Sequence, residues 1–538
     1  MALVYLRSGS LPVTLSMRSL GAGPSPRQVV VPGATSVRPL SWISAVGIPS
    51  FSASSFSCLS SSSLSTFTTI LHWPSSIQPT HQFFLSFLAF SEAVTAAWPT
   101  WAAVFPMLIF RSALTTITCL YLKLPFAITL NLFSRPSHIY FRLSRKLKGR
   151  MDVAVVGGGP SGLLAAGEAA RHGVEAVVFE EHRQIGLPVH CAGLLSISGL
   201  RRLGLPAEGV FVQNRVRGAI FYSPSGLSFA VERPHPVACV VDRALFDQEL
   251  ADRAADRGAD IRLNMRVDRV KPLNGRALIY SRGFKAEASV VIDAEGLRSR
   301  IVKQLGLKTL NWEGVLPAAQ VELRGVEVHE DFVEVHVGSA VAPGFFAWVI
   351  PLGGSWARVG LACRAFSPVK LLKLFVRRRF GVGFSGRCGA GCVLTCGPIP
   401  KTHTGGVLIV GDAAGQVKPT TGGGVVTGGL CGLIAGETAA ESVLKEDCTL
   451  LAEYERRWRK ALGSQFRWMK TARKILNSTP DNVIDEVFRH VLQSGINEEL
   501  SRVGDMDFQA SAIGRLAIGL VQRAPLLALR LLFSWLFA

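Results

Sequence analysis

The pattern of apolar and polar positions predicts an α/β protein from about residue 151 onward. An apolar, mostly β-branched run at 153–156 leads into a glycine-rich turn, and an alanine-rich segment and a second apolar run follow it. This order predicts a strand, a turn, a helix and a second strand. Residues 317–363 alternate apolar and polar side chains, which predicts an antiparallel sheet. Most of residues 450–538 are predicted to be helical.

The glycine-rich turn has the spacing of a dinucleotide-binding site. Gly157, Gly159 and Gly162 form the pattern GxGxxG between the predicted strand and helix. The first glycine permits the tight turn, the second lets the backbone approach a pyrophosphate, and the third lets helix and strand pack closely. Glu180 ends the second strand, 18 residues after Gly162, where it can accept hydrogen bonds from a ribose.

Composition sets residues 1–150 apart from the rest of the chain. They contain twelve Lys and Arg residues but one acidic residue, Glu92, and they are rich in serine. Two apolar stretches, at 83–110 and 113–133, approach membrane-spanning length but are interrupted by proline and lysine. We recognise no catalytic or ligand-binding motif in the sequence of this basic, Ser-rich extension.

Three interpretations of the extension are open. Met151 immediately precedes the first strand, so the working protein would start there and the extension would lie outside the functional fold. Alternatively, the extension is an organellar transit peptide, or it holds one or two poor transmembrane helices with a basic flank at 142–150. The start at Met151 is the favoured interpretation.

A second group of residues points to a flavin. Asp412 follows a buried-type strand at 407–410 and precedes small residues, where a carboxylate can accept hydrogen bonds from a ribityl chain. The alternative is a helix N-cap. Residues 422–424 are glycines that open a helix, whose positive N-terminus would face the flavin and stabilise its reduced form. Further glycines, at four-residue spacing between 428 and 436, predict close helix packing.

These motifs resemble a known family. The turn at 157–162, the loop at 293–299 and the segment 411–415 resemble the flavoprotein hydroxylase-type FAD fold. Four segments are similar to the geranylgeranyl reductase family, in its archaeal branch that acts on glycerophospholipids: 185–193 (IGLPVHCAG), 343–351 (PGFFAWVIP), 411–424 (GDAAGQVKPTTGGG) and 504–508 (GDMDF). The resemblance covers 151–510. This chain departs from the family's motifs at three places: Glu295 stands where the fold usually has Asp, Phe346 where the family usually has Tyr, and Gly193-Leu194 where Glu-Gly is common.

The resemblance implies FAD as the cofactor and extends the list of residues at its site. The implied contacts are Gly157, Gly159, Ser161, Gly162, Glu180, Cys191, Ala192, Gly193, Leu194, Arg243, Val267, Asp412, Gly424 and Val425. Cys191 is also the candidate catalytic residue, with an ordered water as the other proton donor; its plainer interpretation is a small buried hydrophobe. For Arg243 the plainer interpretation is a surface arginine.

No metal site is expected. Cys388, Cys392 and Cys396 recur at four-residue spacing but match no zinc or iron–sulfur pattern.

The predicted fold is an FAD-binding Rossmann-like domain of the flavoprotein hydroxylase type, with an inserted antiparallel-sheet substrate domain and C-terminal helices. The FAD-binding domain is expected at 151–310 and 400–445, and the substrate domain at 311–399. Residues 446–538 are expected to form the helical region.

The last segment, 513–538, is apolar apart from a few residues, chiefly Arg515, Arg523 and Arg530, which fall on one helical face. It is interpreted as a helix on an anionic membrane, which Pro525 is expected to kink or split. The alternative is a terminal helix that faces the core. The net charge of +20 then suits phospholipid. No motif for nucleic acid is present.

The expected function is reduction of the geranylgeranyl double bonds of membrane glycerophospholipids, on the cytoplasmic side of a membrane. Phe345, Phe346, Trp348 and Ile350 would line an apolar tunnel, with Phe346 and Trp348 as substrate contacts. The electron donor is open between NAD(P)H, ferredoxin and a quinol.

Three alternatives belong to other classes: a membrane electron-transfer dehydrogenase of the quinone oxidoreductase type, a flavin monooxygenase, and a lipid-binding protein with a vestigial flavin site. The dehydrogenase would require a cysteine cluster near the C-terminus to bind an iron–sulfur centre. No cysteine follows Cys448.

Overall fold

The computed structural model describes residues 149–298, 300–364, 367–386 and 388–536, and two short paired strands, β1 (Ala2–Leu3) and β2 (Arg18–Ser19). The three interpretations of the extension therefore fall on residues that lie almost wholly outside the described part. Met1–Arg142 and Leu143–Ala538 are separate compact units, and the second holds all the elements below. In the described residues, no helix combines the length and apolar character needed to cross a bilayer.

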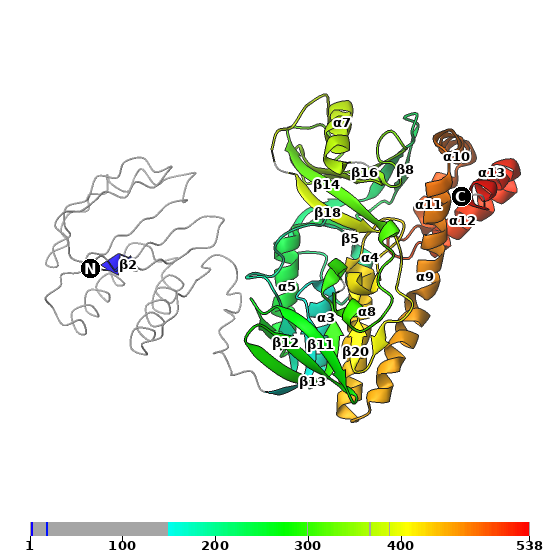
Figure 1. The fold of residues 1–538 in the computed structure, drawn as a ribbon. Coiled ribbons are helices and arrows are strands. Elements are labelled where there is room, and N and C mark those ends of the chain that lie inside the picture. Colours follow the sequence, from blue (N-terminus) through cyan, green and yellow to red (C-terminus); the bar gives the residue numbers. More distant parts are fainter. Residues whose placement is uncertain are drawn as a thin grey trace, which may run out of the picture. The chain divides into compact units, whose positions relative to one another are not determined.

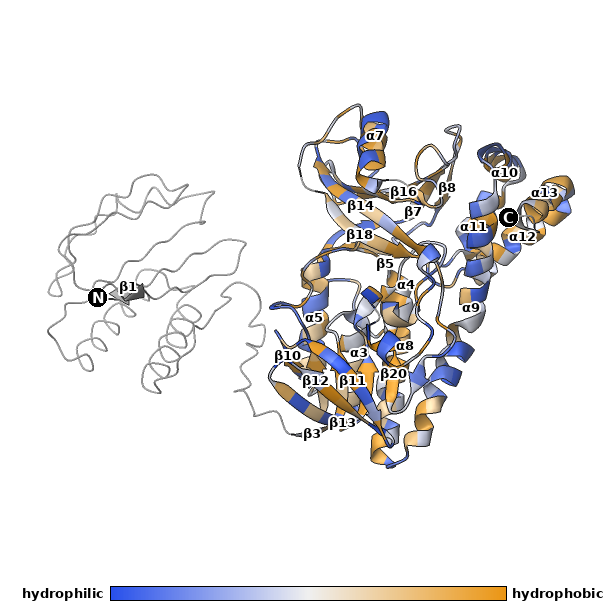
Figure 2. Ribbon diagram, in the orientation of Figure 1, coloured by the Kyte–Doolittle hydropathy of each residue, from blue (hydrophilic) through white to orange (hydrophobic). Residues whose placement is uncertain are grey.

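The first sheet of the second unit is the predicted nucleotide-binding sheet. Its eight strands lie in the order β10 (Asp260–Arg262), β4 (Ala176–Phe179), β3 (Arg150–Val156), β13 (Phe284–Asp293), β12 (Arg276–Ser281) and β11 (Val267–Leu273), with β20 (Val407–Ile409) beside β13 and β19 (His403–Thr404) beside β20. β10, β4, β3, β13 and β20 run parallel. Their apolar side chains fill the core and colour this part of Figure 2 orange.

Helices α3 (Pro160–Arg171), α5 (Arg243–Asp256) and α8 (Val425–Leu444) cover this sheet (Figure 1). α3 begins at a proline, which needs no hydrogen-bond partner for a backbone N–H. A Cβ added at Gly432 or Gly436 would lie 2.3 Å from a backbone oxygen of α3. The predicted glycine face is therefore a close helix contact.

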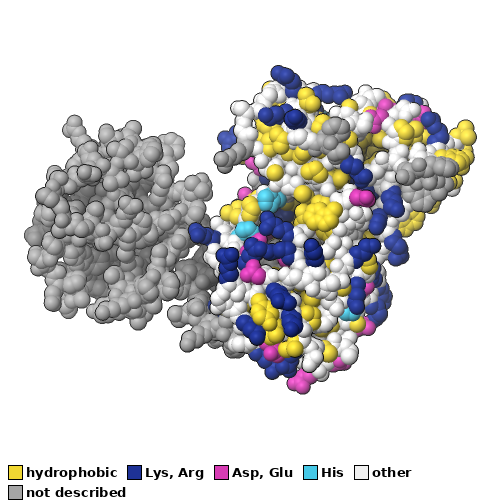
Figure 3. All heavy atoms as spheres, viewed as in Figure 1, with side chains coloured by type: hydrophobic (Ala, Val, Ile, Leu, Met, Phe, Trp, Pro, Cys, Tyr) yellow, Lys and Arg dark blue, Asp and Glu magenta, His cyan; other side chains and the backbone are white. Residues whose placement is uncertain are grey.

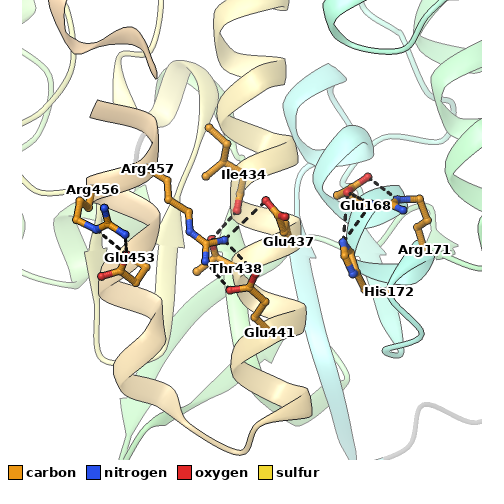
Figure 4. A network of polar contacts seen from close by, with 10 residues as sticks. All are labelled: Glu168, Arg171, His172, Ile434, Glu437, Thr438, Glu441, Glu453, Arg456 and Arg457. Atoms are coloured by element: carbon orange, nitrogen blue, oxygen red, sulfur yellow. Dashed lines mark hydrogen bonds and ion pairs between the residues drawn. The ribbon is translucent and has the colours of Figure 1, made fainter. Parts of the chain in front are cut away.

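Helix α9 (Ala452–Ser478) is long and packs beside α8 along one side of the second unit (Figure 1). Arg457 of α9 pairs with Glu441 of α8 at 2.6 Å, as Figure 4 shows. Such half-exposed pairs contribute little free energy. They fix the position of α9 along α8.

The second sheet has seven strands in the order β18 (Gly389–Leu394), β14 (Val315–Arg324), β17 (Trp356–Ala362), β16 (Phe346–Pro351), β15 (Phe332–Val337), β7 (Gly218–Tyr222) and β8 (Ser228–Glu232). All neighbours are antiparallel except β15 and β7. α7 (Pro368–Phe380) packs on one face. Two of the strands come from the segment 151–310, and the predicted domain boundaries stay a prediction.

The remaining elements connect or cover these two sheets. A third, small sheet holds β5 (Leu194–Ser196), β9 (Ala238–Val241) and β6 (Val212–Val216). The helices are α4 (Ile197–Arg202), α6 (Arg300–Gln304), α10 (Asp481–Ser494), α11 (Ile496–Val503), α12 (Ala510–Arg523) and α13 (Pro525–Leu536), with 3₁₀ turns η3 (Gly296–Arg298), η4 (Trp312–Gly314), η5 (Gly411–Ala414) and η6 (Cys448–Leu451).

The predicted C-terminal helix is divided in two. Pro525 begins α13, and the residue before it has left the helical conformation, as a residue before proline tends to do. Arg515 pairs with Glu499 and Arg530 with Glu486, while Arg523 donates to a backbone oxygen of α10. Pro525 is expected to kink or split this helix, and it splits it. The expectation that the three arginines form one open basic stripe is wrong, because they bind α10 and α11.

Candidate active site

A cavity of about 1980 Å³ extends between the two large sheets and the C-terminal helices. Pockets for one small molecule usually measure about 300–1,000 Å³, so this volume suits two ligands. Figure 3 shows the surface hollowed on one face, with Lys and Arg side chains gathered beside the hollow. All the predicted cofactor and substrate residues line this cavity.

The three glycines of the turn have different roles in the structure. Gly157 has a φ of +104°, and a Cβ there would lie 2.3 Å from a carbonyl oxygen that follows β13. A Cβ at Gly162 would lie 2.1 Å from the Gly157 oxygen. At Gly159, by contrast, an added Cβ meets no atom within 4 Å. Gly157 and Gly162 therefore serve packing, and Gly159 leaves open the space that a pyrophosphate would approach.

The Glu180 carboxylate lies directly beside this turn. One oxygen accepts a hydrogen bond from the Gly158 N–H at 2.7 Å, and the other accepts from the His182 N–H at 2.8 Å. The His182 Nδ1 lies 2.6 Å from the second oxygen. The structure thus holds Glu180 in the cavity wall, where the fingerprint places the ribose.

The loop that contains Cys191 is fastened to the second sheet. Gln320 of β14 donates to the Cys191 carbonyl at 3.2 Å, and Arg358 of β17 donates to the Ala192 carbonyl at 2.7 Å. Gly193 has a φ of +72°, and a Cβ there would lie 2.4 Å from a β9 carbonyl oxygen. A glycine is therefore needed at 193. Leu194 follows as the first residue of β5.

Arg243 joins this loop to the flavin side of the cavity. It is the first residue of α5, its side chain is 12% exposed, and it binds Asp247 through two hydrogen bonds of 3.0 and 2.9 Å. Burial opposes the charge of the guanidinium, but Cys191 and Asp247 facing it raise the pKa of Arg243. The alternative of a surface arginine is wrong.

Asp412 lies in η5 at the N-terminus of α8. Gly424 is the N-cap of α8, so the alternative that Asp412 caps this helix is wrong. A Cβ at Gly424 would lie 2.9 Å from an Asp412 carboxylate oxygen, which shows how closely the carboxylate approaches the helix start. Val425 begins the helix, and Val267 begins β11 in the opposite wall.

Three buried polar atoms of the described residues have no hydrogen-bond partner near the turn. They are Asp293 Oδ2, Glu295 Oε2 and Arg300 Nε. Glu295 and Arg300 line the cavity, and their charged groups stand 3.7 Å apart. A buried polar atom without a partner is costly, and the hydroxyl and phosphate groups of FAD would supply partners. The residues present therefore fit FAD.

Burial raises the pKa of Asp293 well above its ordinary value, and the nearby Glu295 carboxyl adds to the effect. Sequence reasoning noted Glu295 as a departure but missed Asp293 and Arg300. The signal was available, because Asp293 begins the loop at 293–299 and Arg300 follows it.

Two further basic residues escaped the sequence interpretation. Lys418, in the loop before α8, lies 2.5 Å from an Asp507 carboxylate oxygen and donates to the Met506 carbonyl at 3.1 Å. Arg473 of α9 donates to the Pro419 carbonyl at 3.1 Å, and burial lowers its pKa to about 10. Both side chains are buried in the cavity wall and fix the loop that opens α8.

The substrate side of the cavity is one face of the second sheet. Along β16, Phe346, Trp348 and Ile350 line the cavity, as the two-residue period of a strand requires. Phe345 does not line it: its ring is buried, stacks on Phe346 at 4.2 Å and lies under the Arg473 guanidinium. The prediction that Phe345 lines the tunnel is wrong. Successive side chains of an extended chain point to opposite faces, so Phe345 points away from the face that Phe346, Trp348 and Ile350 share.

Apolar side chains on this face form two rows that cross the strands. Phe229, Phe221, Val335 and Trp348 lie in register on neighbouring strands, and Val231, Ala219 and Val333 lie beside them. We call these seven residues the apolar track. Beyond Trp348 the first row continues to Gly360 and Gln320, and Gln320 contacts the Cys191 loop. The track therefore leads from the edge strand β8 to the predicted flavin site.

Asp412→Asn should make the apoprotein more stable and its binding of FAD weaker. Burial raises the pKa of the Asp412 carboxyl, although Arg243 partly offsets this. The apoprotein therefore loses stability as the pH rises from the ordinary carboxyl pKa through the raised one. At neutral pH the variant apoprotein should unfold at higher temperature than wild type. Its FAD affinity should fall tenfold to a hundredfold, roughly, since a charged acceptor is lost.

Thermal unfolding and flavin titration would measure both effects, with the exposed Glu208→Gln as control. Unchanged FAD affinity in Asp412→Asn would refute the ribityl assignment.

Comparison with known proteins agrees with this geometry. Residues 150–365 match the family model of an FAD binding domain. A protein named digeranylgeranylglycerophospholipid reductase 2 from Methanothermobacter thermautotrophicus is 37% identical over 63% of this chain and 91% of its own length. A digeranylgeranylglycerophospholipid reductase from Methanocaldococcus jannaschii is 34% identical over 63% of this chain and 90% of its own.

A solved structure from Thermoplasma acidophilum, described as geranylgeranyl bacteriochlorophyll reductase-like, superposes with a TM-score of 0.64. It is 26% identical and covers 72% of this chain and 99% of its own. A flavin-dependent brominase, 19% identical with a TM-score of 0.54, covers 70% of this chain and 99% of its own and shares the fold.

The fold and the site define an FAD-dependent oxidoreductase of the flavoprotein hydroxylase type, which confirms the predicted fold class and cofactor. Within that class, the chain belongs to the geranylgeranyl reductase family.

Proposed function

We propose that this enzyme saturates the geranylgeranyl double bonds of a membrane glycerophospholipid, using an electron donor that reduces its FAD. The observation that carries the proposal is the apolar track, which leads over the second sheet to the loop of Cys191. A polyprenyl chain is long, apolar and narrow, and the track offers it rows of aromatic and aliphatic side chains. The names of the curated relatives support the same substrate class.

The residues of the chain divide the work of this reaction. Bound FAD would supply a hydride once reduced. Glu180, Asp412 and the N-terminus of α8 would hold it, and Arg243 would fix the loop beside it. An isolated alkene has no carbonyl to take up electron density, so a proton must reach its second carbon. Cys191, in the wall where the track meets the flavin residues, stays the candidate donor, with an ordered water as the alternative.

The test is an anaerobic incubation of the FAD-loaded protein with dithionite and a geranylgeranylated glycerophospholipid, followed by mass spectrometry of the lipid. A mass gain of two hydrogens for each reduced bond is expected. A lipid that stays unsaturated, with flavin that a quinone reoxidises quickly, would favour the electron-transfer alternative.

We also propose that the enzyme contacts a membrane surface, on the cytoplasmic side. The exposed apolar side chains of α12 and α13 support the contact itself. Ile518, Val521, Leu526, Leu529, Leu532 and Phe533 are 44% to 77% exposed. Hydrophobic side chains gather at this end of the molecule, at the right edge of Figure 3. Val521, Leu529 and Leu532 also line the cavity, so the apolar surface continues into it. A lipid could pass from a bilayer into the cavity along such a surface.

The double variant Ile518→Asp, Leu526→Asp should therefore bind liposomes less tightly than wild type. Both side chains are exposed and neither lines the cavity. Burying a leucine or isoleucine contributes about 1.5–3 kcal/mol, so each change should weaken partitioning roughly tenfold or more. Liposome flotation measures the effect, with Val210→Asp as control, because Val210 is 85% exposed in the turn before β6. Equal flotation of variant and wild type would contradict the membrane contact, and a concentration-dependent dimer would point to a second copy instead.

A further inference from the structure

The apolar track ends in a basic side chain at the edge of the sheet. Phe229, Val231 and Arg233 alternate along β8 and its extension, so they share the face that lines the cavity. The Arg233 N–H still bonds to the Arg217 carbonyl, which continues the ladder by one residue. Its guanidinium donates to the Gly504 carbonyl at 2.9 Å. A cation thus stands where the apolar rows stop.

Two more basic side chains line the same part of the cavity. His235 follows Arg233 in the connection to β9, and Arg201 belongs to α4, whose first residue bonds to the carbonyl of Val237. The neighbour Arg202 pairs with Asp505 at 3.7 Å, next to the Gly504 that Arg233 contacts. Arg233 and α4 therefore meet at the turn at 504–507, and His235 and Arg201 are close to them in the chain.

In the described part of the chain, no carboxylate forms an ion pair with Arg201, Arg233 or His235. Several basic residues elsewhere in the wall do have such partners: Arg217 pairs with Glu232 and Asp331, and Arg300 with Glu295. The two arginines at this end of the cavity therefore have no ion-pair partner in the described residues and lie beside an apolar surface, which suits an anionic amphiphile.

We propose that Arg201, Arg233 and His235 bind the phosphate group of the prenyl lipid. Guanidinium groups bind phosphate oxygens through paired hydrogen bonds, which fix orientation as well as charge. From β8 to β16 the sheet spans three strand spacings, roughly 14 Å. A phosphate held at Arg233 would thus place the chain along the track and its more distant double bonds near Trp348. The inference rests on the proposed function and adds the recognition of the head group to it.

The experiment measures binding and needs no turnover. The full-length, FAD-loaded protein is titrated with the phosphate ester of the fully saturated diether lipid and, separately, with the same lipid carrying a free hydroxyl. Arg233→Gln and Arg201→Gln should each lower the affinity for the phosphate lipid tenfold to a hundredfold, roughly, because a charged hydrogen bond is lost. Binding of the hydroxyl lipid should change by less than twofold, roughly, since the apolar track is intact. Arg233→Lys should restore part of the affinity, and Arg282→Gln, on the exposed turn after β12, is the matched control.

Each outcome decides the inference. An equal loss of affinity for both lipids, or no loss for either, would overturn it. Flavin absorbance shows whether a variant has kept its fold. Inorganic phosphate that binds as tightly as the phosphate lipid would make the site one for free phosphate, which also overturns the assignment to a head group. If the phosphate lipid binds through Arg233 but its unsaturated form is never reduced, the site stands and the proposed function fails. If both unsaturated lipids are reduced and Arg233→Gln changes nothing, the function stands and the site fails.

Discussion

Gly159→Ala should lose tight FAD binding while the apoprotein folds as wild type does. Its φ of −80° and ψ of 175° are allowed for alanine, and the added Cβ meets no protein atom within 4 Å. In the holoenzyme the same Cβ would stand where the pyrophosphate approaches the backbone. We expect the affinity to fall about a hundredfold, or about 2.8 kcal/mol. Flavin titration and thermal unfolding of the apoprotein measure the two quantities separately.

Gly162→Ala is the matched comparison, because its Cβ would meet the Gly157 oxygen at 2.1 Å. That change should lower the unfolding temperature of the apoprotein as well as the FAD affinity. If Gly159→Ala binds FAD as tightly as wild type, the turn does not hold the pyrophosphate and the site has been placed wrongly.

The parts of the site that depend on local sequence were predictable. The turn from Gly157 to Gly162 needs glycine for steric reasons that act within one strand and one helix, and the spacing alone reveals them. Asp412 and the glycines before α8 are local in the same way. Their positions follow from a buried strand, a 3₁₀ turn and a helix N-terminus that are consecutive in the chain.

Contacts between distant segments could not be predicted from periodicity. β7 pairs with β15 across more than a hundred residues, so nothing local shows that Phe221 and Val335 are neighbours in the apolar track. The buried pair of Lys418 and Asp507 is separated by 89 residues. Each partner alone has the pattern of an ordinary surface charge, and burial becomes visible only once the C-terminal segment packs on the loop.

Two errors have signals in the sequence. Phe345 has the opposite parity to Phe346, Trp348 and Ile350, so a strand at this place cannot direct all four side chains into one tunnel. Pro525, between Arg523 and Arg530, is expected to kink or split the helix, but the three arginines are still projected onto one helical face. A helical projection across that proline assumes a continuous helix, which the missing N–H and the preceding residue do not allow.

The electrostatics of the site follow from its burial. Arg243, Asp247, Asp293 and Asp412 are all removed from water, and the arginine is close enough to Asp412 to lower its pKa partly against the effect of burial. A cofactor with hydroxyl and phosphate groups would relieve part of this cost. Binding of FAD should therefore contribute to the stability of the whole unit, as a ligand that binds only the folded state does.

Trp348→Ala should slow reduction of the lipid about a hundredfold while FAD remains bound. The indole lies over Gly360, where a Cβ would be only 2.5 Å from it, and its edge meets Phe346 at a centroid distance of 6.2 Å. The residues assigned to FAD lie on other elements. The loss should thus fall on the position of the alkene, where a displacement of about 1 Å can cost about a hundredfold in rate. Single-turnover oxidation of the reduced flavin by a geranylgeranyl lipid measures this rate, and Trp312→Ala, on a residue that is 60% exposed and outside the cavity, is the control. Oxidation by a quinone should keep its wild-type rate. If Trp348→Ala slows the quinone and leaves the lipid rate unchanged, the track does not carry the prenyl chain.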